Sequence, residues 1–177
     1  MKTVEKGLVI IYTGNGKGKT TAALGLILRA VGYSKRCLII QFGKGWFTGE
    51  LKAIKNLPRV KIIQGGKGFV GILGDQLSKE IHQQAAQQTF DLIYKEVISG
   101  KWDIVVGDEF IGTISSKLLP LRLAIGLIKD KPKNLDLILT GRNVPRKLIK
   151  MADLVTEMKE IKHPYQKGIL AKRGVDF

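Results

Sequence analysis

Residues 13–21 carry the residue types that bind phosphate groups. The segment reads Thr-Gly-Asn-Gly-Lys-Gly-Lys-Thr-Thr and directly follows an apolar run at residues 8–12. Glycines let consecutive backbone N–H groups surround phosphate oxygens, and a helix that begins after them adds partial positive charge. Lys19 could reach the terminal phosphates of a nucleotide, and the Thr20 hydroxyl could hold Mg²⁺. The expected residues for binding a nucleoside triphosphate are Thr13, Gly14, Asn15, Gly16, Lys17, Gly18, Lys19, Thr20 and Thr21.

The match to the phosphate-loop pattern G-x-x-x-x-G-K-[ST] is incomplete, because Thr13 stands where the first glycine belongs. A glycine-rich turn without a ligand is the alternative, but the strand before it and the helix after it favour a phosphate site. A dinucleotide fingerprint fits less well. Its third glycine would fall on Lys19, and the second strand ends in Gln41 where an acidic residue would be expected.

A second group of chemically capable residues is the acid pair Asp108 and Glu109, which follows an apolar strand predicted at residues 102–107. Carboxylates at the carboxyl edge of a parallel sheet lie beside the phosphates of a bound nucleotide and hold Mg²⁺ directly or through water. Many strands end in an acid, so the pair alone is weak evidence for a metal site. It becomes stronger evidence because a phosphate loop precedes it in the sequence. The predicted metal ligands are Thr20, Asp108 and Glu109.

Strands and helices alternate along the chain. Strands are predicted at residues 8–12, 37–42, 60–64, 102–107, 135–140 and 154–158, and helices at residues 19–31, 50–56, 75–99, 120–129 and 145–152. This alternation predicts the α/β class, with a mainly parallel sheet and helices on both of its faces.

The longest predicted helix covers residues 75–99. Its apolar residues recur every four positions, Asp75 is a suitable N-cap, and Gly100 is a suitable stop. His82 is one position away from the apolar stripe, so we expect it at the surface or at the boundary of the core.

Two glycine-rich loops follow predicted strands. Loop 43–49 contains Trp46 and Phe47, which either contact a ligand or cap the core. Loop 65–74 alternates glycines with apolar residues. It is either a lid over an apolar ligand or a loop that packs against its own sheet.

Composition limits the possible classes. A chain of 177 residues with 44% hydrophobic residues predicts a single domain covering residues 1–177. The one cysteine, Cys37, is expected to be buried in an apolar strand and cannot form an internal disulfide, which indicates a reducing compartment. No membrane span or signal peptide is evident, so we expect a cytoplasmic protein.

The net charge of +15 comes from residues spread along the whole chain. It is weak support for nucleic-acid binding and better support for an acidic partner.

Taken in order, these motifs resemble the ATP:corrinoid adenosyltransferases of the P-loop type. The resemblance begins at the phosphate loop, with threonine in place of its first glycine, and covers almost the whole chain. The other matching segments are residues 41–42, 49–50, 68–69, 105–109, 119–121, 139–142, 152–157, 162–163 and 174–177.

The resemblance implies a P-loop NTPase (RecA-like) fold and transfer of the 5′-deoxyadenosyl group of ATP to the reduced cobalt of a corrinoid, with release of triphosphate. It implies catalytic roles for Lys19, Phe69 and Arg142, with Arg142 also binding the nucleotide. Mg²⁺ is the implied cofactor and a corrinoid the co-substrate. A homodimer and an acidic electron-donor protein are the implied partners.

The sequence also departs from the family pattern. Gly71 stands where a second lid aromatic is common, Ile111 and Gly112 replace polar or larger residues after the acid pair, and the first strand begins only a few residues into the chain. These departures concern corrinoid handling and leave the ATP residues intact. They motivate one alternative, an ATP-binding regulatory relative without corrinoid chemistry. The basic charge motivates another, a basic P-loop ATPase that binds nucleic acid.

Overall fold

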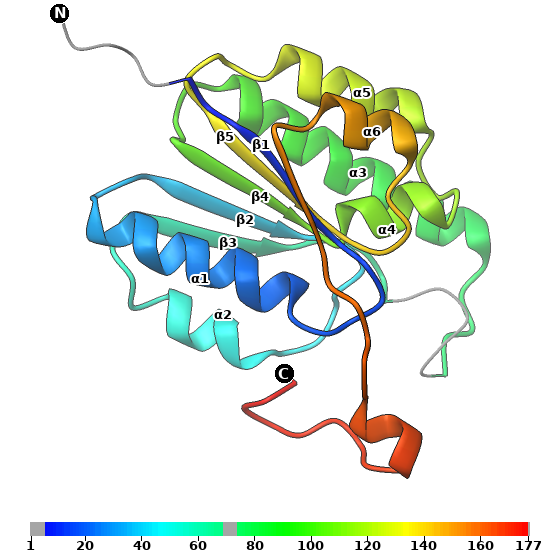
Figure 1. The fold of residues 1–177 in the computed structure, drawn as a ribbon. Coiled ribbons are helices and arrows are strands. Elements are labelled where there is room, and N and C mark those ends of the chain that lie inside the picture. The colour runs from blue at the N-terminus through cyan, green and yellow to red at the C-terminus, as the bar shows by residue number, and fades with distance from the viewer. Residues whose placement is uncertain (1–5, 69–73, 177) are drawn as a thin grey trace, which may run out of the picture.

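Six parallel strands form one sheet in this computed structural model, which describes residues 6–68 and 74–176 (Figure 1). The strand order is β3-β2-β4-β5-β1-β6. The strands are β1 (Val9–Thr13), β2 (Cys37–Gln41), β3 (Val60–Gln64), β4 (Ile104–Asp108), β5 (Asp136–Thr140) and β6 (Leu154–Glu157). The parallel sheet predicted from the sequence is confirmed.

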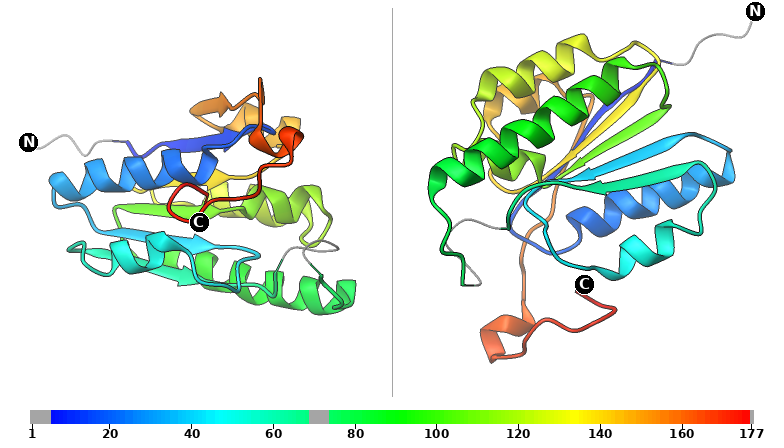
Figure 2. Two further views of the ribbon diagram at one scale, coloured as in Figure 1. Left: turned by 90° about the horizontal axis from the view of Figure 1, so that it is seen from below. Right: turned by 180° about the vertical axis from the view of Figure 1, so that it is seen from behind.

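Helices cover both faces of the sheet, as the sequence predicts (Figures 1 and 2). One face carries α1 (Lys19–Gly32) and α2 (Gly49–Ile54), and the other carries α3 (Lys79–Ile98), α4 (Phe110–Ser115), α5 (Leu121–Asp130) and α6 (Arg146–Met151). A short 3₁₀ helix, η1 (Pro164–Lys167), lies in the C-terminal segment.

The two-residue repeat of the strands divides the core into two layers. In β1, Val9 and Ile11 pack with α3 and α5, whereas Ile10 packs with α1. Because both faces are covered, β2 and β4 are buried along their whole length. Burial of each such aliphatic side chain stabilises the fold by about 1.5–3 kcal/mol relative to exposure. The sheet is therefore a rigid base for the loops at its carboxyl edge.

The single cysteine, Cys37, is fully buried at the start of β2, as expected. Burial, and secondarily the nearby Asp103 carboxylate, raises the pKa of its thiol to about 11. At neutral pH the thiol is therefore protonated and acts as a small apolar side chain.

The start of the longest helix differs from the prediction. Helix α3 begins at Lys79 with Ser78 as its N-cap residue, so the assignment of Asp75 as N-cap is wrong. His82 is also not at the surface. It is only 2% exposed, and its Nε2 lies 2.9 Å from Asp75 Oδ2. Asp75, in the segment before α3, supplies a polar partner for the buried histidine, which periodicity does not reveal.

Among the helices that the structure describes, none combines the length and apolar character needed to cross a lipid bilayer.

Candidate active site at the carboxyl edge of the sheet

The phosphate loop is held in place by the segment that follows β6. Gly16 N donates to Met158 O (2.7 Å), and Met158 N donates to Thr13 O (2.8 Å). Gly14 adopts φ 98°, and a Cβ atom there would collide with the Met158 carbonyl. Glycine is therefore required at this position both by its dihedral angle and by this close approach. The loop is a fixed cradle whose outer side is closed by neighbouring backbone.

Lys19 folds back over this loop. Its side chain is buried, and Nζ donates to the carbonyl oxygens of Gly14 and Gly16, at 2.9 Å each. Burial lowers the pKa of the Lys19 ammonium and Arg142 adds to this effect, while Glu109 and Asp108 oppose it. The ammonium thus lies inside the curve of the loop, which is the region where bound phosphates would need a cation.

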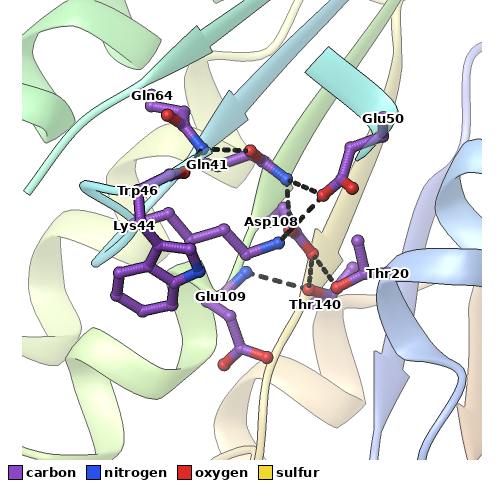
Figure 3. Close-up of polar contacts among 9 residues, drawn as sticks. All are labelled: Thr20, Gln41, Lys44, Trp46, Glu50, Gln64, Asp108, Glu109 and Thr140. Carbon is purple, nitrogen blue, oxygen red and sulfur yellow. Dashed lines mark hydrogen bonds and ion pairs between the residues drawn. The ribbon is translucent and has the colours of Figure 1, made fainter. Parts of the chain in front are cut away.

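Asp108, at the end of β4, is the centre of a polar network that joins three strands and α1 (Figure 3). Its carboxylate is 1% exposed and accepts from four side chains. The donors to Oδ1 are the hydroxyls of Thr20 and Thr140 (2.8 Å each), and the donors to Oδ2 are Gln41 Nε2 (3.2 Å) and Lys44 Nζ (3.1 Å). The predicted pair of Thr20 and Asp108 is therefore in direct contact.

Glu109 points away from this network, although it is adjacent in sequence (Figure 3). It is the N-cap residue of α4 with φ 58°, and its backbone N–H donates to Thr140 Oγ1 (2.9 Å). The left-handed backbone turns its carboxylate toward Gly112, where a Cβ atom would lie 3.1 Å from Oε2. Burial, and then the neighbouring Asp108, raises the pKa of the Glu109 carboxyl.

The raised pKa of Glu109 makes a prediction about stability. When folding raises the pKa of an acid, the native state holds the proton more tightly than the unfolded state does. The resulting stabilisation is complete below the unfolded pKa, about 4.3 for Glu, and is lost as pH rises through the folded pKa. Glu109→Gln is therefore expected to increase the free energy of unfolding of the nucleotide-free protein at pH 7 to 8, and to have little effect near pH 4. The same variant is expected to weaken Mg²⁺-dependent ATP binding.

Urea unfolding of wild type and Glu109→Gln across this pH range measures the difference. Glu160→Gln, at an exposed position in the C-terminal segment, is the matched control. A Glu109→Gln variant that is less stable than wild type at pH 8 would contradict the prediction.

A cavity of about 500 Å³ opens in front of the phosphate loop. Its lining residues are Lys17, Gly18, Lys19, Thr20, Thr21, Leu24, Lys44, Trp46, Thr48, Gly49, Glu50, Glu109, Gly174, Val175 and Asp176. They come from the phosphate loop, the first two turns of α1, the loop after β2, the start of α2, the residue after β4 and the C-terminal segment. A cavity of this size with polar groups on one side is suitable for a nucleotide-sized ligand.

The C-terminal segment forms one wall of this cavity. After β6 the chain leaves the sheet, and it returns to the phosphate loop (Figures 1 and 2). Lys17 Nζ donates to Val175 O (2.9 Å) and forms an ion pair with Asp176. The closing residues, which carried part of the family resemblance, therefore meet the phosphate loop in space.

The structure brings most of the predicted site residues together. Lys17, Gly18, Lys19, Thr20, Thr21 and Glu109 line the cavity, while Thr13, Gly14, Asn15 and Gly16 form the loop behind it. Arg142 is exposed at the end of β5, and no hydrogen bond or ion pair joins it to another described residue. Phe69 and Gly71 lie outside the described residues. Sequence reasoning missed the roles of Gln41, Lys44, Glu50 and Asp176 in the network and the cavity wall.

The oxygen ligands available at this site suit Mg²⁺. The Thr20 hydroxyl and the Asp108 carboxylate are hard oxygen ligands, 2.8 Å apart beside the phosphate loop. Within residues 6–68 and 74–176, no three His, Cys, Asp or Glu side chains cluster closely enough to hold a metal by themselves. Mg²⁺ usually takes one or two protein ligands and completes its shell with phosphate oxygens and water, so the Thr20 hydroxyl and the Asp108 carboxylate fit it.

Comparison with known proteins gives a consistent result. The family model described as ATP:corrinoid adenosyltransferase BtuR/CobO/CobP matches residues 5–177. The chain is 32% identical to the corrinoid adenosyltransferase of Escherichia coli (strain K12), over 98% of this chain and 87% of that protein. It is 33% identical to the corrinoid adenosyltransferase CobA of Salmonella typhimurium, with the same coverage, and 38% identical to a corrinoid adenosyltransferase of a Sinorhizobium species, over 99% of this chain and 83% of that protein.

The match spans both ends of the chain and includes the phosphate loop, the acid pair and the C-terminal segment that meet at the cavity. The chain belongs to the ATP:corrinoid adenosyltransferase family.

Proposed function

We infer that this chain transfers the adenosyl group of ATP to a corrinoid, in the synthesis or salvage of adenosylcobalamin. The observation that carries this inference is the cavity in front of the phosphate loop, in a chain that matches the family along its whole length. Family membership favours this function over a nucleic-acid-binding ATPase with a similar phosphate loop.

The chemistry requires little from the protein beyond positioning and charge. A reduced Co(I) corrinoid is itself the nucleophile: its electron pair forms the cobalt–carbon bond at C5′, and the C5′–O bond breaks with its electrons on the departing triphosphate. No proton transfer is needed, which agrees with the lack of a paired acid and base in the sequence. Positioning of two reactants can lower the barrier by about 7–11 kcal/mol.

We assign the leaving triphosphate to the phosphate loop. Lys19, inside the curve of the loop, is the first candidate cation. Arg142 is the second candidate, since its charge already acts on both Lys19 and Glu109. Thr20 and Asp108 would hold Mg²⁺, with Glu109 acting through water. Bound Mg²⁺ would supply positive charge to the oxygens of the leaving triphosphate, as it does to the phosphates in phosphoryl-transfer sites.

The corrinoid is proposed to lie over the loops at the carboxyl edge of β2 and β3. Trp46, in the first of these loops, is partly exposed and lines the cavity, and Phe47 is more exposed. Gly66, in the second loop, lies so close to Gly43 that a Cβ atom would collide with its backbone, so the two loops pack together. A corrinoid held there would face the nucleotide across the cavity.

We also propose a homodimer and an acidic electron-donor protein as partners. The edge strand β6 and the segment after it expose Leu154, Ile161 and Tyr165, which supply apolar area for a second copy. The net charge of +15 would attract an acidic donor protein, and this association should weaken as salt increases.

An anaerobic assay tests the function directly. Mg-ATP and a chemically reduced corrinoid are incubated with the protein, and the products are identified. A light-sensitive adenosylcorrinoid with inorganic triphosphate is the expected result. Phosphate release stimulated by DNA or RNA would support the nucleic-acid-binding ATPase instead, and ATP binding without turnover would support a regulatory relative.

Phe69 provides a prediction about the corrinoid. From the family resemblance, this residue displaces the lower axial ligand and so makes Co(II) easier to reduce. Phe69→Ala is therefore expected to reduce activity with a corrinoid that carries its lower base much more than with one that lacks it. Electron paramagnetic resonance of bound Co(II) with ATP should show a four-coordinate species in wild type and little of it in the variant. Equal losses with both corrinoids would assign Phe69 to packing alone.

A further inference from the structure

A lysine ammonium lies between two carboxylates at the cavity wall (Figure 3). Lys44 Nζ is 3.1 Å from Asp108 Oδ2 and 3.4 Å from Glu50 Oε1. The three side chains are largely shielded from solvent, at 12% exposure for Lys44, 16% for Glu50 and 1% for Asp108. In the nucleotide-free protein, Lys44 is therefore the cation that balances these two acids.

The two carboxylates are positioned independently of Lys44. Gln41 Nε2 donates to both Glu50 Oε1 (3.1 Å) and Asp108 Oδ2 (3.2 Å). Gln41 is fixed in turn by Gln64, whose Nε2 donates to Gln41 Oε1 (3.2 Å) and to Trp46 O (3.1 Å). Because these amides belong to the ends of β2 and β3, the Asp108 and Glu50 carboxylates should keep their places when the ammonium leaves.

Two features would allow the Lys44 ammonium to move away from the carboxylates when Mg²⁺ binds. Its acceptor Asp108 also contacts the Thr20 hydroxyl, so Mg²⁺ binding at this position would bring a second cation to the same carboxylate. Lys44 lies between Gly43, which has φ 65°, and Gly45, whose surroundings are open. Its side chain lines the cavity in which the phosphate chain would lie.

We propose that Lys44 is an exchangeable counter-ion of the metal site. Its ammonium neutralises Asp108 and Glu50 in the nucleotide-free protein, gives way to Mg²⁺, and then binds the phosphate chain. Glu50 thereby joins Asp108 as a carboxylate that attracts the metal. The exchange links metal binding to the arrival of a further cation at the leaving triphosphate. This inference rests on the proposed function for the identity of Mg-ATP as the ligand.

The first test measures Mn²⁺ binding by electron paramagnetic resonance in the absence of nucleotide and corrinoid. Lys44→Met is expected to bind Mn²⁺ more tightly than wild type, on the order of tenfold, because a cation that competes at close range has been removed. Lys44→Arg retains the charge and should bind as wild type does. Lys52→Met, which removes the same charge at an exposed position of α2, should leave Mn²⁺ binding unchanged.

The second test measures binding of inorganic triphosphate with Mg²⁺ by calorimetry. Here Lys44→Met should bind more weakly than wild type, on the order of tenfold, because one phosphate-directed cation is missing. This change of sign distinguishes exchange from a structural role, which would weaken both ligands. Unchanged or weaker Mn²⁺ binding in Lys44→Met would overturn the proposal, and unchanged triphosphate binding would overturn its second step.

Two further measurements exclude misfolding of the variants and test whether Asp108 is the carboxylate that attracts Mn²⁺. Thermal unfolding of each variant establishes that it is folded, and Lys44→Gln replaces Lys44→Met if the methionine variant is not. Combining Lys44→Met with Asp108→Asn should abolish the gain in Mn²⁺ affinity, since the attracting carboxylate is gone. The Mn²⁺ measurement contains no ATP or corrinoid, so a wild-type protein without adenosyl transfer would refute the proposed function and leave this result standing.

Discussion

Lys19→Ala is expected to lower kcat roughly a hundredfold, a loss comparable to that of one oxyanion-hole donor of about 3 kcal/mol. The structure gives the physical reason. The ammonium is buried within the curve of the phosphate loop, where it is held by the carbonyl oxygens of Gly14 and Gly16. The charge that develops on the leaving triphosphate would lose its nearest counter-charge. Single-turnover formation of the adenosylcorrinoid measures the loss.

Lys35→Ala is the matched control for this variant. It removes the same charge at an exposed position before β2, at the amino ends of the strands and therefore away from the phosphate loop at their carboxyl ends. The control should turn over at the wild-type rate, and both variants should unfold within a few degrees of wild type. Wild-type turnover by Lys19→Ala would mean that the triphosphate leaves from another site.

Asp108→Asn is expected to abolish the strengthening of ATP binding by Mg²⁺. The amide loses the negative charge that attracts the metal and that pairs with the Lys44 ammonium. With its NH₂ group turned toward the two threonine hydroxyls, which can accept, the amide oxygen still accepts from Gln41 Nε2 and Lys44 Nζ. The hydrogen bond from Lys44 then no longer has a charged acceptor, and because hydrogen bonds to charged groups contribute about 1.5–3 kcal/mol, the variant should also be less stable.

Calorimetric titration of ATP with and without Mg²⁺ measures the first effect, and urea unfolding measures the second. Asp91→Asn is the control, since Asp91 is an exposed carboxylate on α3 that accepts from the Gln87 side chain. An Asp108→Asn variant whose ATP affinity still rises with Mg²⁺ would place the metal elsewhere.

The sequence predicted those parts of the fold that repeat regularly. Strand β3 occupies the predicted residues, β1 is shifted from its predicted position by one residue, and β2 ends one residue earlier than predicted. The agreement is close because buried parallel strands are continuous apolar runs bounded by turns. Helix α4 was missed. It has only six residues, contains Gly112 and begins at a left-handed Glu109, so it carries neither the length nor the capping signals of a helix.

The candidate site was predictable where one motif contains all the groups, as in the phosphate loop. The contact between Thr20 and Asp108 also followed from the sequence, because both stand at the same edge of the sheet. The network of Gln41, Lys44 and Glu50 did not, since it depends on the path of an irregular loop. The same holds for the ion pair of Lys17 and Asp176, whose partners are separated by 159 positions and joined by a segment without periodicity.

The buried position of Cys37 has a practical consequence for spectroscopy. Thiol-directed probes react with the thiolate, and this sulfur is both enclosed in the sheet and protonated at neutral pH. The natural chain therefore behaves toward such reagents as if it contained no cysteine. A cysteine introduced at exposed Lys172 would be the only position labelled. A spin label or fluorophore there would report the distance between the C-terminal segment and a bound nucleotide analogue without prior removal of any native residue.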